Sequence, residues 1–351
     1  MTPITIPSSP TLNAEESPIS PGPNESEGKP LAFRPLPLLS HPHVQTLLGH
    51  FLPGPTITLP TREQVIHLPD GDGLVLHDNA PPGWRPGDRI ALVIHGLTGS
   101  HDSPGVKRVA ARLLGHGLRT VRLDQRGTGK GLALARGAYH AGRSDDVRAA
   151  LEEIHRWSPA SPIILLGISL GGALVLKTAG EVVEHPLPYL ERVAAMNPPI
   201  DLERCAALIA LPRNRMYNRY FSGLLVEQAR ERQGYFPDLP PVRFPRRMSI
   251  RLYDDLYTAP RGGFKDALDY YRRASSYRLL DRITVPTFVL TARDDPFIAV
   301  EPFEDAKTPN NVVVQITPKG GHIGFVGWEG SGVVRWAESR ILEWIVREGR
   351  Q

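Results

Sequence analysis

The sequence has little cysteine and no long apolar run. Its single cysteine, Cys205, cannot form an internal disulfide, which favours a reducing compartment. The first ten residues have neither a basic start nor a continuous apolar block, so they do not resemble a secretory signal. The longest apolar run, from Pro162 to Leu176, contains three glycines and is too short for a membrane span. The sequence therefore predicts a cytoplasmic protein without a transmembrane helix.

A strong overall charge is also absent, because the formal net charge is +4 over 351 residues. This balance gives no reason to expect a nucleic-acid partner. The charge is unevenly distributed, with ten arginines and three acidic residues between Arg204 and Arg251. Residues 1–30 are rich in Pro, Ser, Glu and Asn and have few large apolar side chains, so we predict a disordered tail. Residues 31–351 are predicted to form the folded domain.

From His41 onward, short β-rich runs alternate with longer amphipathic runs, which is typical of a mostly parallel sheet flanked by helices. Eight strands are predicted near residues 64–68, 74–79, 90–95, 119–123, 163–167, 193–197, 287–291 and 312–316, and helices near 106–116, 145–157, 173–183 and 333–347. The first two strands are expected to be antiparallel. Residues 198–280 interrupt the alternation with mainly helical sequence, so we predict a cap inserted after the sixth strand.

A Gly-x-Ser-x-Gly motif lies between an apolar run and a helical stretch, with Ser169 at its centre. This context predicts a nucleophile elbow, in which the serine is held in a strained turn and Gly167 and Gly171 let neighbouring backbones approach closely. The backbone amide of Leu170 is then one expected oxyanion donor. The second is the amide of Leu97, in the glycine-rich loop after the third strand.

The base and the acid are expected after the nucleophile, in the order serine, acid, histidine. Only His185 and His322 follow Ser169, and His322 lies in a glycine-rich loop after the last predicted strand. Asp294 and Asp295 both follow the seventh strand, and either carboxylate could orient the histidine. We choose Asp295, because an acid followed by two residues and an aliphatic fits the usual arrangement here, and we expect Asp294 to act in the turn.

These motifs resemble those of the YheT-like branch of the α/β hydrolases, which is related to the mammalian ABHD1, ABHD2 and ABHD3 group. The resemblance runs from about His41 to the C-terminal helix and includes HPHVQTLLGHFLP at 41–53, HGLTGS at 95–100, RGTGKG at 126–131, YHAG at 139–142, GISLGG at 167–172, DDPFI and GGHIGF. It implies the α/β-hydrolase fold, Ser169 as nucleophile, His322 as base, and esterase or lipase-like chemistry without metal or cofactor. Family members often have Asn-x-Arg-Gly where this chain has Asp-Gln-Arg-Gly at 124–127.

Two further groups of residues have competing interpretations. His41, His43 and His50 could suggest a metal, but they lack nearby carboxylate or cysteine ligands, and we interpret them as part of a structural segment. His140 and Asp145 have the H-x4-D spacing that some relatives use in acyl transfer. Asp145 also stands where a helix cap is expected.

The sequence as a whole predicts a serine hydrolase that cleaves small-molecule or lipid esters of carboxylic acids. Acyl transfer on the same triad and a catalytically silent interaction protein on the hydrolase scaffold stay open as alternatives. The arginine excess predicts either acidic substrates or peripheral contact with an anionic membrane, against the simpler interpretation of a solvated helical face. Arg213, Arg215 and Arg219 are the candidates for this contact.

Overall fold

The computed structural model describes residues 32–52, 54, 57, 60–329 and 332–347. The chain divides into two compact units, Met1–Ala32 and Phe33–Gln351, and the second contains every element discussed below. The predicted disordered tail of residues 1–30 lies outside the described residues. In the described ranges, no helix is both long enough and apolar enough to cross a bilayer.

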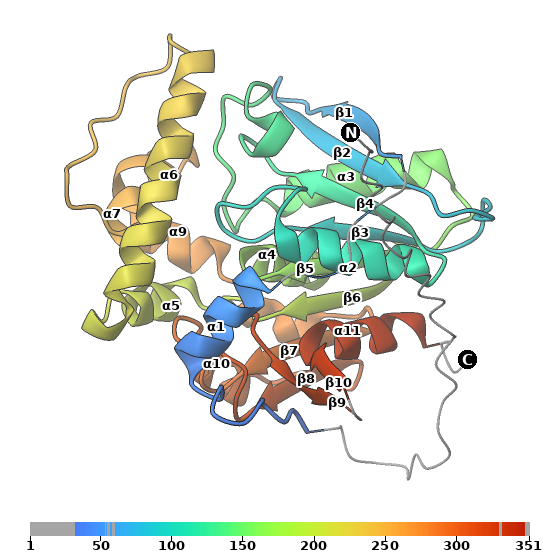
Figure 1. Cartoon of the computed structure of the whole chain (residues 1–351). Coiled ribbons are helices and arrows are strands. Elements are labelled where there is room, and N and C mark those ends of the chain that lie inside the picture. Colours follow the sequence, from blue (N-terminus) through green and yellow to red (C-terminus); the bar gives the residue numbers. More distant parts are fainter. Residues whose placement is uncertain (1–31, 53, 55–56, 58–59, 330–331, 348–351) are drawn as a thin grey trace, which may run out of the picture. The chain divides into compact units, whose positions relative to one another are not determined.

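An eight-stranded sheet forms the centre of the second unit, in the order β1-β2-β4-β3-β5-β6-β7-β8 (Figure 1). The strands are β1 (Arg62–His67), β2 (Gly73–Asn79), β3 (Ile90–Ile94), β4 (Arg119–Asp124), β5 (Ile163–Ile168), β6 (Leu190–Met196), β7 (Thr287–Ala292) and β8 (Val312–Thr317). Strands β3 to β8 are parallel, whereas β2 pairs antiparallel with both β1 and β4. The predicted mostly parallel sheet of the α/β-hydrolase fold is confirmed.

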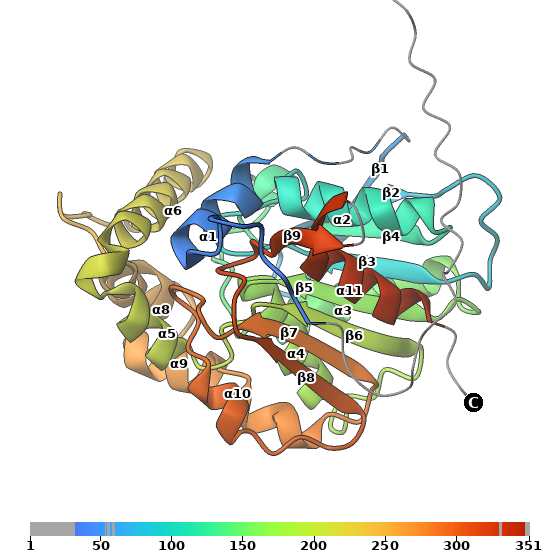
Figure 2. The same cartoon turned by 60° about the horizontal axis from the view of Figure 1, so that its bottom comes forward.

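Helices cover both faces of this sheet (Figure 2). They are α2 (Pro104–Gly115) and α11 (Trp336–Val346) on one face, and α3 (Ser144–Trp157) and α4 (Leu170–Gly180) on the other. Along β3, Ile90, Leu92 and Ile94 join the apolar cluster beneath α3 and α4, while Ala91 and Val93 join the cluster beneath α2 and α11. Successive side chains of a strand point to opposite faces, so a strand covered on both sides needs a continuous apolar run.

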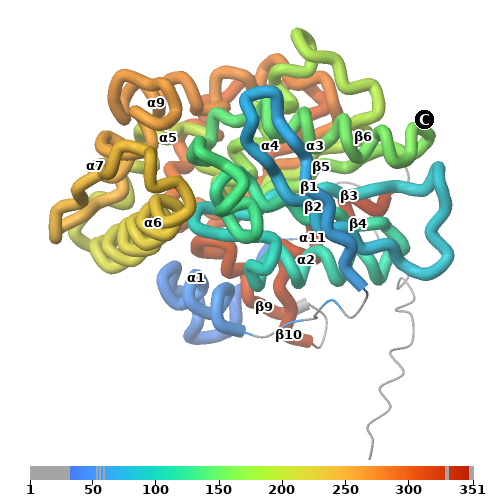
Figure 3. The backbone as a smooth tube through the Cα atoms, turned by 90° about the horizontal axis from the view of Figure 1, so that it is seen from above, coloured from blue at the N-terminus to red at the C-terminus, as the bar shows by residue number. Residues whose placement is uncertain are grey.

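The segment between β6 and β7 forms helices and, in the described chain, no strand. Its elements are α5 (Leu202–Ile209), η2 (Pro212–Asn214), α6 (Arg215–Tyr235), α7 (Ile250–Tyr253), the π-helical η3 (Asp254–Thr258), α8 (Ala259–Arg261), α9 (Ala267–Ala274) and η4 (Tyr277–Arg282). Figure 3 shows α5, α6, α7 and α9 gathered on one side of the sheet. We keep the name cap for residues 198–280, and its role as a lid over a site stays a prediction.

Two elements differ from the sequence expectation. The helix predicted at 333–347 begins only at Trp336, because Gly332–Arg335 forms strand β10, antiparallel to β9 (Val326–Glu329). The β-branched pair at 333 and 334 explains the difference, since stiff side chains of this kind favour a strand. Residues 41–53, predicted only as a structural segment, contain helix α1 (Pro42–Phe51), whose first position suits proline. The remaining short helices are η1 (Gly129–Gly131) and α10 (Glu301–Asp305).

Candidate active site

Ser169 occupies the sharp turn between β5 and α4, with φ of 53° and ψ of −121°. Positive φ is strained for a residue with a side chain, and such strain is found at functional turns. A Cβ atom added to Gly167 would lie 2.2 Å from the carbonyl oxygen of Gly171, and one added to Gly171 would lie 2.5 Å from that of Ile94. Because the crowding atoms belong to the backbone, both positions require glycine.

The loop after β8 brings His322 to Ser169. Nε2 of His322 lies 3.0 Å from Oγ of Ser169, and Nδ1 lies 2.7 Å from Oδ2 of Asp295. When Nδ1–H donates a hydrogen bond to the carboxylate, Nε2 is left as the acceptor for the serine hydroxyl. The structure therefore brings the three predicted triad residues together, and it leaves only 7% of His322 and 5% of Asp295 exposed.

The two adjacent aspartates after β7 have different partners. Oδ1 of Asp295 accepts the backbone amides of Phe297 and Ile298, both at 3.0 Å, which orients the carboxylate toward the imidazole. Oδ1 of Asp294 instead accepts the amide of Gly321 at 2.9 Å. Burial raises the pKa of Asp294 above its ordinary value. Asp294 thus supports the histidine loop, whereas Asp295 contacts the histidine ring.

Asn197 is a further partner of the acid that the sequence analysis missed. It follows β6 with φ of 46°, a conformation that asparagine tolerates better than most residues. Its Nδ2 donates to Oδ2 of Asp295 at 2.8 Å and to the carbonyl oxygen of Gly321 at 3.3 Å. The amide therefore links the acid to the histidine loop. Neighbouring parallel strands end at the same edge of the sheet, so a polar residue directly after β6 was a usable signal.

The two predicted oxyanion donors flank Ser169. Leu170 is the first residue of α4, where backbone amides have no partner inside the helix and the helix dipole favours negative charge. Leu97 follows Gly96, and a Cβ atom added to Gly96 would lie 3.0 Å from Cβ of Ser169. The loop after β3 thus passes directly beside Ser169, where its amides would face an oxyanion formed at that serine.

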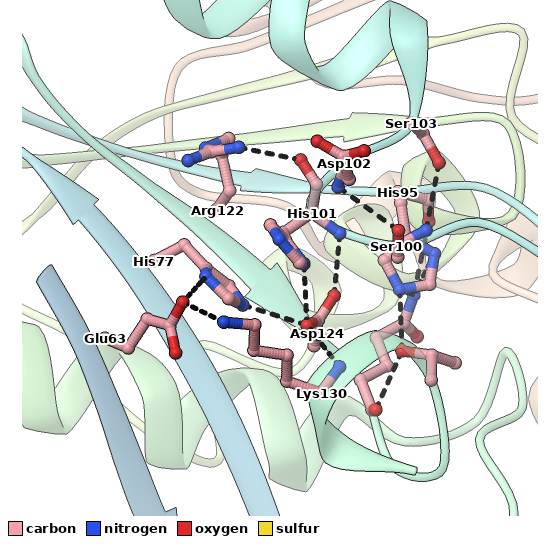
Figure 4. Close-up of polar contacts among 12 residues, drawn as sticks. Glu63, His77, His95, Ser100, His101, Asp102, Ser103, Arg122, Asp124 and Lys130 are labelled. Carbon is pink, nitrogen blue, oxygen red and sulfur yellow. Dashed lines mark hydrogen bonds and ion pairs between the residues drawn. The ribbon is translucent and has the colours of Figure 1, made fainter. Parts of the chain in front are cut away.

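Asp124, at the end of β4, anchors the loop that carries Leu97 (Figure 4). Its Oδ1 accepts the backbone amide of His101 at 2.7 Å, and its Oδ2 accepts Nδ1 of His101 at 2.8 Å and Nε2 of His77 at 2.9 Å. Burial acts to raise the pKa of Asp124, but the hydrogen bonds from His101 and His77 outweigh burial and hold the pKa well below its ordinary value. A fixed negative charge therefore holds one end of the loop.

His77, His101 and Asp124 are also residue types that bind metal ions, and their candidate ligand atoms lie within 4.8 Å of one another. The two imidazole rings, however, stack with centroids 3.4 Å apart and planes 9° apart. An imidazole binds a metal through a lone pair that lies in the plane of its ring. Because the two rings are stacked and nearly parallel, an ion in the plane of one ring would lie well out of the plane of the other. The geometry favours a hydrogen-bonded cluster over a metal centre.

The histidines of the first helix are not gathered into a comparable cluster. Nδ1 of His43 lies 3.2 Å from the hydroxyl oxygen of Tyr217 in α6, and the two rings stack with centroids 5.5 Å apart. The ring of His50 instead packs edge-on against Phe51. These contacts give His43 and His50 packing roles, in agreement with the structural interpretation of the segment.

Ser169 and His322 line a cavity with a volume of about 590 Å³. Most of its wall is apolar and includes Leu202, Ile209, Phe221, Leu225, Tyr253 and Tyr257 of the cap, with Leu47 and Phe51 of α1. Polar side chains on the wall include those of His140, Arg232 and Asp254. A cavity of this size and character can hold the acyl chain of a lipid or another apolar ester.

His140 lines the cavity but is not joined to Asp145. Nδ1 of His140 accepts the amide of Gly142 at 3.1 Å, so the ring proton of the neutral form is on Nε2. Burial lowers the pKa of His140 to about 3. Asp145 is exposed in the first turn of α3, 3.9 Å from Arg143. His140 is therefore a neutral hydrogen-bond donor at ordinary pH, which does not suit the base of an H-x4-D acyltransferase.

Comparison with known proteins gives the family. The α/β hydrolase family model matches residues 91–334. YheT of Escherichia coli (strain K12), named as a candidate esterase, is 31% identical over 318 residues, which are 89% of this chain and 92% of that protein. Phospholipase ABHD3 of Bos taurus is 26% identical over 291 residues, which are 80% of this chain and 70% of that protein.

Solved structures share the fold at low identity. An esterase of Pyrococcus furiosus, 18% identical, aligns with a TM-score of 0.52 over 83% of this chain and 98% of its own. A 2,6-dihydroxy-pseudo-oxynicotine hydrolase, 16% identical, aligns with a TM-score of 0.55 over 82% of this chain and 68% of its own. The names of the sequence relatives support hydrolase activity. The chain belongs to the α/β hydrolase family, in the branch that includes YheT.

Proposed function

We propose that the chain is a serine hydrolase that cleaves carboxylic esters through an acyl-enzyme intermediate on Ser169. The observation that carries the proposal is the pair of hydrogen bonds that joins Ser169 to His322 at 3.0 Å and His322 to Asp295 at 2.7 Å. A nucleophile bonded to a base that is itself oriented by an acid is the arrangement that activates a serine. The strained turn of Ser169 and the esterase and phospholipase names among the relatives support the same reaction.

In the proposed first step, His322 removes the proton from Ser169 as Oγ attacks the ester carbonyl carbon. The amides of Leu97 and Leu170 stabilise the oxyanion, and Asp295 stabilises the imidazolium. His322 then donates its proton to the leaving alkoxide, and the alcohol departs. Water attacks the acyl-enzyme with His322 again as base, and collapse of the second intermediate releases the free acid and restores Ser169.

Acyl transfer to an alcohol or thiol is the main alternative on the same triad. His140 disfavours a separate transferase centre, because its Nδ1 already accepts the amide of Gly142 and burial lowers its pKa, which leaves the ring a poor proton acceptor. Transfer from Ser169 itself is tested by adding an alcohol acceptor and measuring the new ester against free acid. A silent interaction protein is disfavoured by the bonded triad, since nothing in a binding role requires that arrangement.

Covalent labelling tests the proposal directly. A fluorophosphonate should label the native chain, and Ser169→Ala should lose the label and about a million-fold of esterase turnover. Ser103→Ala is the matched control, because Ser103 also lines the cavity but its Oγ accepts the amide of Ser100. Turnover of Ser169→Ala within tenfold of the native chain would contradict the nucleophile. A series of nitrophenyl esters of increasing chain length would then identify the preferred acyl group.

We also propose that the mouth of the cavity meets a lipid surface. Leu47 and Phe51 of α1 and Met216 and Tyr220 of α6 line the cavity and are exposed to solvent at 41%, 74%, 60% and 53%. Large exposed apolar side chains at the rim of an apolar cavity are typical of proteins that take substrate from an interface. The two helices that carry them are in contact through the stacked pair His43 and Tyr217.

Exposed arginines give this surface a positive charge. Arg213, Arg215 and Arg219 lie within the same stretch of chain as Met216 and Tyr220, and all three are exposed. Cationic side chains next to apolar ones favour an anionic membrane. Charge reversal at the three arginines should weaken binding to anionic vesicles at low salt and leave binding to neutral vesicles unchanged. Equal binding of the native chain and the charge-reversed variant to anionic vesicles would indicate that the arginines only form a solvated helical face.

A further inference from the structure

Arg232 of α6 lies on the wall of the catalytic cavity with an incomplete set of partners. Only 3% of the residue is exposed. Its Nη1 donates to the carbonyl oxygen of Gly137, and its Nη2 has no hydrogen-bond partner in the described chain. The guanidinium carbon lies 5.0 Å from the ring centroid of Tyr257, which provides a cation–π contact. An arginine has five donors, and the two on Nη2 are unused in the described chain.

No carboxylate of the described ranges pairs with this guanidinium. Asp72 is the acid that acts on it electrostatically, but Oδ2 of Asp72 already accepts Nη1 of Arg126 at 2.6 Å and the amide of Gly137 at 2.9 Å. Arg126 shows the usual solution for a buried arginine, because Asp70, Asp72 and Asp146 all bond to it. Arg232 is equally buried but has no carboxylate partner among the residues described. Burial of an unpaired charge is unfavourable unless a ligand supplies the anion.

The cavity connects this arginine with the reaction centre. Leu97, beside the nucleophile, packs against the apolar cluster that contains Leu225 and Tyr257, and the guanidinium of Arg232 faces the ring of Tyr257. Gly127 also packs closely against Arg232, since a Cβ atom added to this glycine would lie 3.3 Å from Cδ of the arginine. Ser169, Leu97, Gly127, Tyr257 and Arg232 all line the same cavity.

Tyr257 belongs to the π-helical segment Asp254–Thr258, and short π-helical turns are frequent at functional sites. Asp254 of this segment also lines the cavity. Its carboxylate accepts the hydroxyl of Tyr271 at 2.7 Å and forms no ion pair with Arg232 in the described chain. The carboxylate of Asp254 therefore does not pair with the guanidinium, which stays available to a ligand.

We propose that Arg232 binds an anionic group, a phosphate or a carboxylate, that the ester substrate carries at a distance from its scissile bond. A guanidinium matches both oxyanions through paired N–H donors, and the closed, apolar surroundings strengthen the attraction. The inference rests on the proposed esterase function and adds to it a substrate class, acidic amphiphilic esters. No covalent step involves Arg232, which acts by binding and orienting the substrate.

Paired substrates test the preference. Mononitrophenyl esters of dicarboxylic acids from succinate to sebacate have a free carboxylate, and nitrophenyl esters of monocarboxylic acids of equal length are neutral. For the chain length that the native chain prefers, Arg232→Gln should lower the ratio of kcat/KM for acidic over neutral ester by about tenfold or more, and Arg232→Lys by less. Arg230→Gln, on the exposed side of the same helix, should leave the ratio unchanged. An unchanged ratio in Arg232→Gln at every chain length would overturn the inference.

A binding measurement separates this inference from the esterase proposal. Calorimetry with Ser169→Ala should detect decyl phosphate, and adding Arg232→Gln should weaken its binding about tenfold or more. Decanol, without the anion, should bind both forms alike. Binding that is equally strong with and without Arg232 overturns the inference, and so does inorganic phosphate that binds as tightly as decyl phosphate, because the anion would then not be part of an amphiphile. Binding that requires Arg232 in a chain without esterase turnover would overturn only the catalytic proposal.

Discussion

Asp295→Asn is the sharpest test of the proposed triad, because the change preserves shape and reverses hydrogen-bond polarity. In the native chain, Oδ2 of Asp295 accepts Nδ1 of His322 at 2.7 Å and Nδ2 of Asn197 at 2.8 Å. Oδ1 accepts the amides of Phe297 and Ile298. An asparagine would keep its oxygen on the two backbone amides, so its NH₂ group would face two donors. The histidine can adapt by accepting at Nδ1 and carrying its proton on Nε2.

The consequence for catalysis follows from this tautomer. A protonated Nε2 cannot accept the proton of Ser169, so turnover should fall by about four orders of magnitude, equivalent to about 5 kcal/mol of transition-state stabilisation. The measurement is kcat and kcat/KM on a soluble nitrophenyl ester, with the rate of fluorophosphonate labelling of Ser169 as a second readout. The substitution fills the same volume, so the melting temperature should change much less than the activity.

Asp294→Asn is the matched control. Asp294 contacts the amide of Gly321 through Oδ1, and an asparagine oxygen can accept the same amide. The expected loss is about 1 kcal/mol of the free energy of unfolding, with turnover within about tenfold of the native chain. If Asp294→Asn were the inactive variant and Asp295→Asn the active one, the assignment of the acid would be wrong by one residue.

Three further substitutions test the surroundings of the site. Gly171→Ala should prevent folding or cost several kcal/mol, because its Cβ would lie 2.5 Å from the carbonyl oxygen of Ile94; expression and melting measurements check this. Asp124→Asn should destabilise the chain by about 3 kcal/mol and lower kcat. Since the folded pKa of Asp124 is lowered, its contribution exists above pH of about 4 and should fade as pH falls. Burial raises the pKa of Asp254 to about 6, so the native chain should lose stability relative to Asp254→Asn as pH rises from about 4 through 6, by up to about 3 kcal/mol in urea titrations.

The sheet and the strand-to-helix turn that carries Ser169 could be predicted because their determinants are local in the sequence. Each buried strand is a short apolar run, and Gly167 and Gly171 stand on either side of Ser169 in one short motif between an apolar run and a helical stretch. His322 and Asp295 could be placed because the order of strands fixes which loops reach the same edge. The predicted start of the last helix was wrong. Val333 and Val334 fit a helical pattern in the sequence, but in the structure they pair with strand β9.

The partners of the triad were harder to predict, because they depend on tertiary contacts between distant segments. The whole cap and β7 lie between Asn197 and Asp295 in the sequence, and a lone asparagine after a strand is most often a turn residue. His77, His101 and Asp124 likewise come from three separate parts of the chain and meet only in the folded structure. Periodicity predicts which face of an element is buried, but it does not predict which polar groups from other elements will meet there.

The burial of Arg232 could be predicted in part, because the periodicity of α6 places it on the buried face of the helix. Leu225 and Ala229 are buried, and Arg232 stands three positions further on the same helical face. The pattern therefore predicts burial for Arg232, whereas its charge predicts exposure. Positions where the helical pattern and the residue type make opposite predictions are expected at functional or strained sites.

The arginine excess of the cap therefore has two physical parts, which salt should separate. Arg213, Arg215 and Arg219 are exposed, so their attraction to anionic vesicles is screened over about 10 Å at 0.1 M salt. Arg232 is buried, where an ion pair with a bound anion is screened much less. Raising the salt concentration should thus weaken vesicle binding strongly, while the preference for acidic over neutral soluble esters should change by less than about threefold. If both properties decreased in parallel, the preference would come from the exposed arginines and not from Arg232.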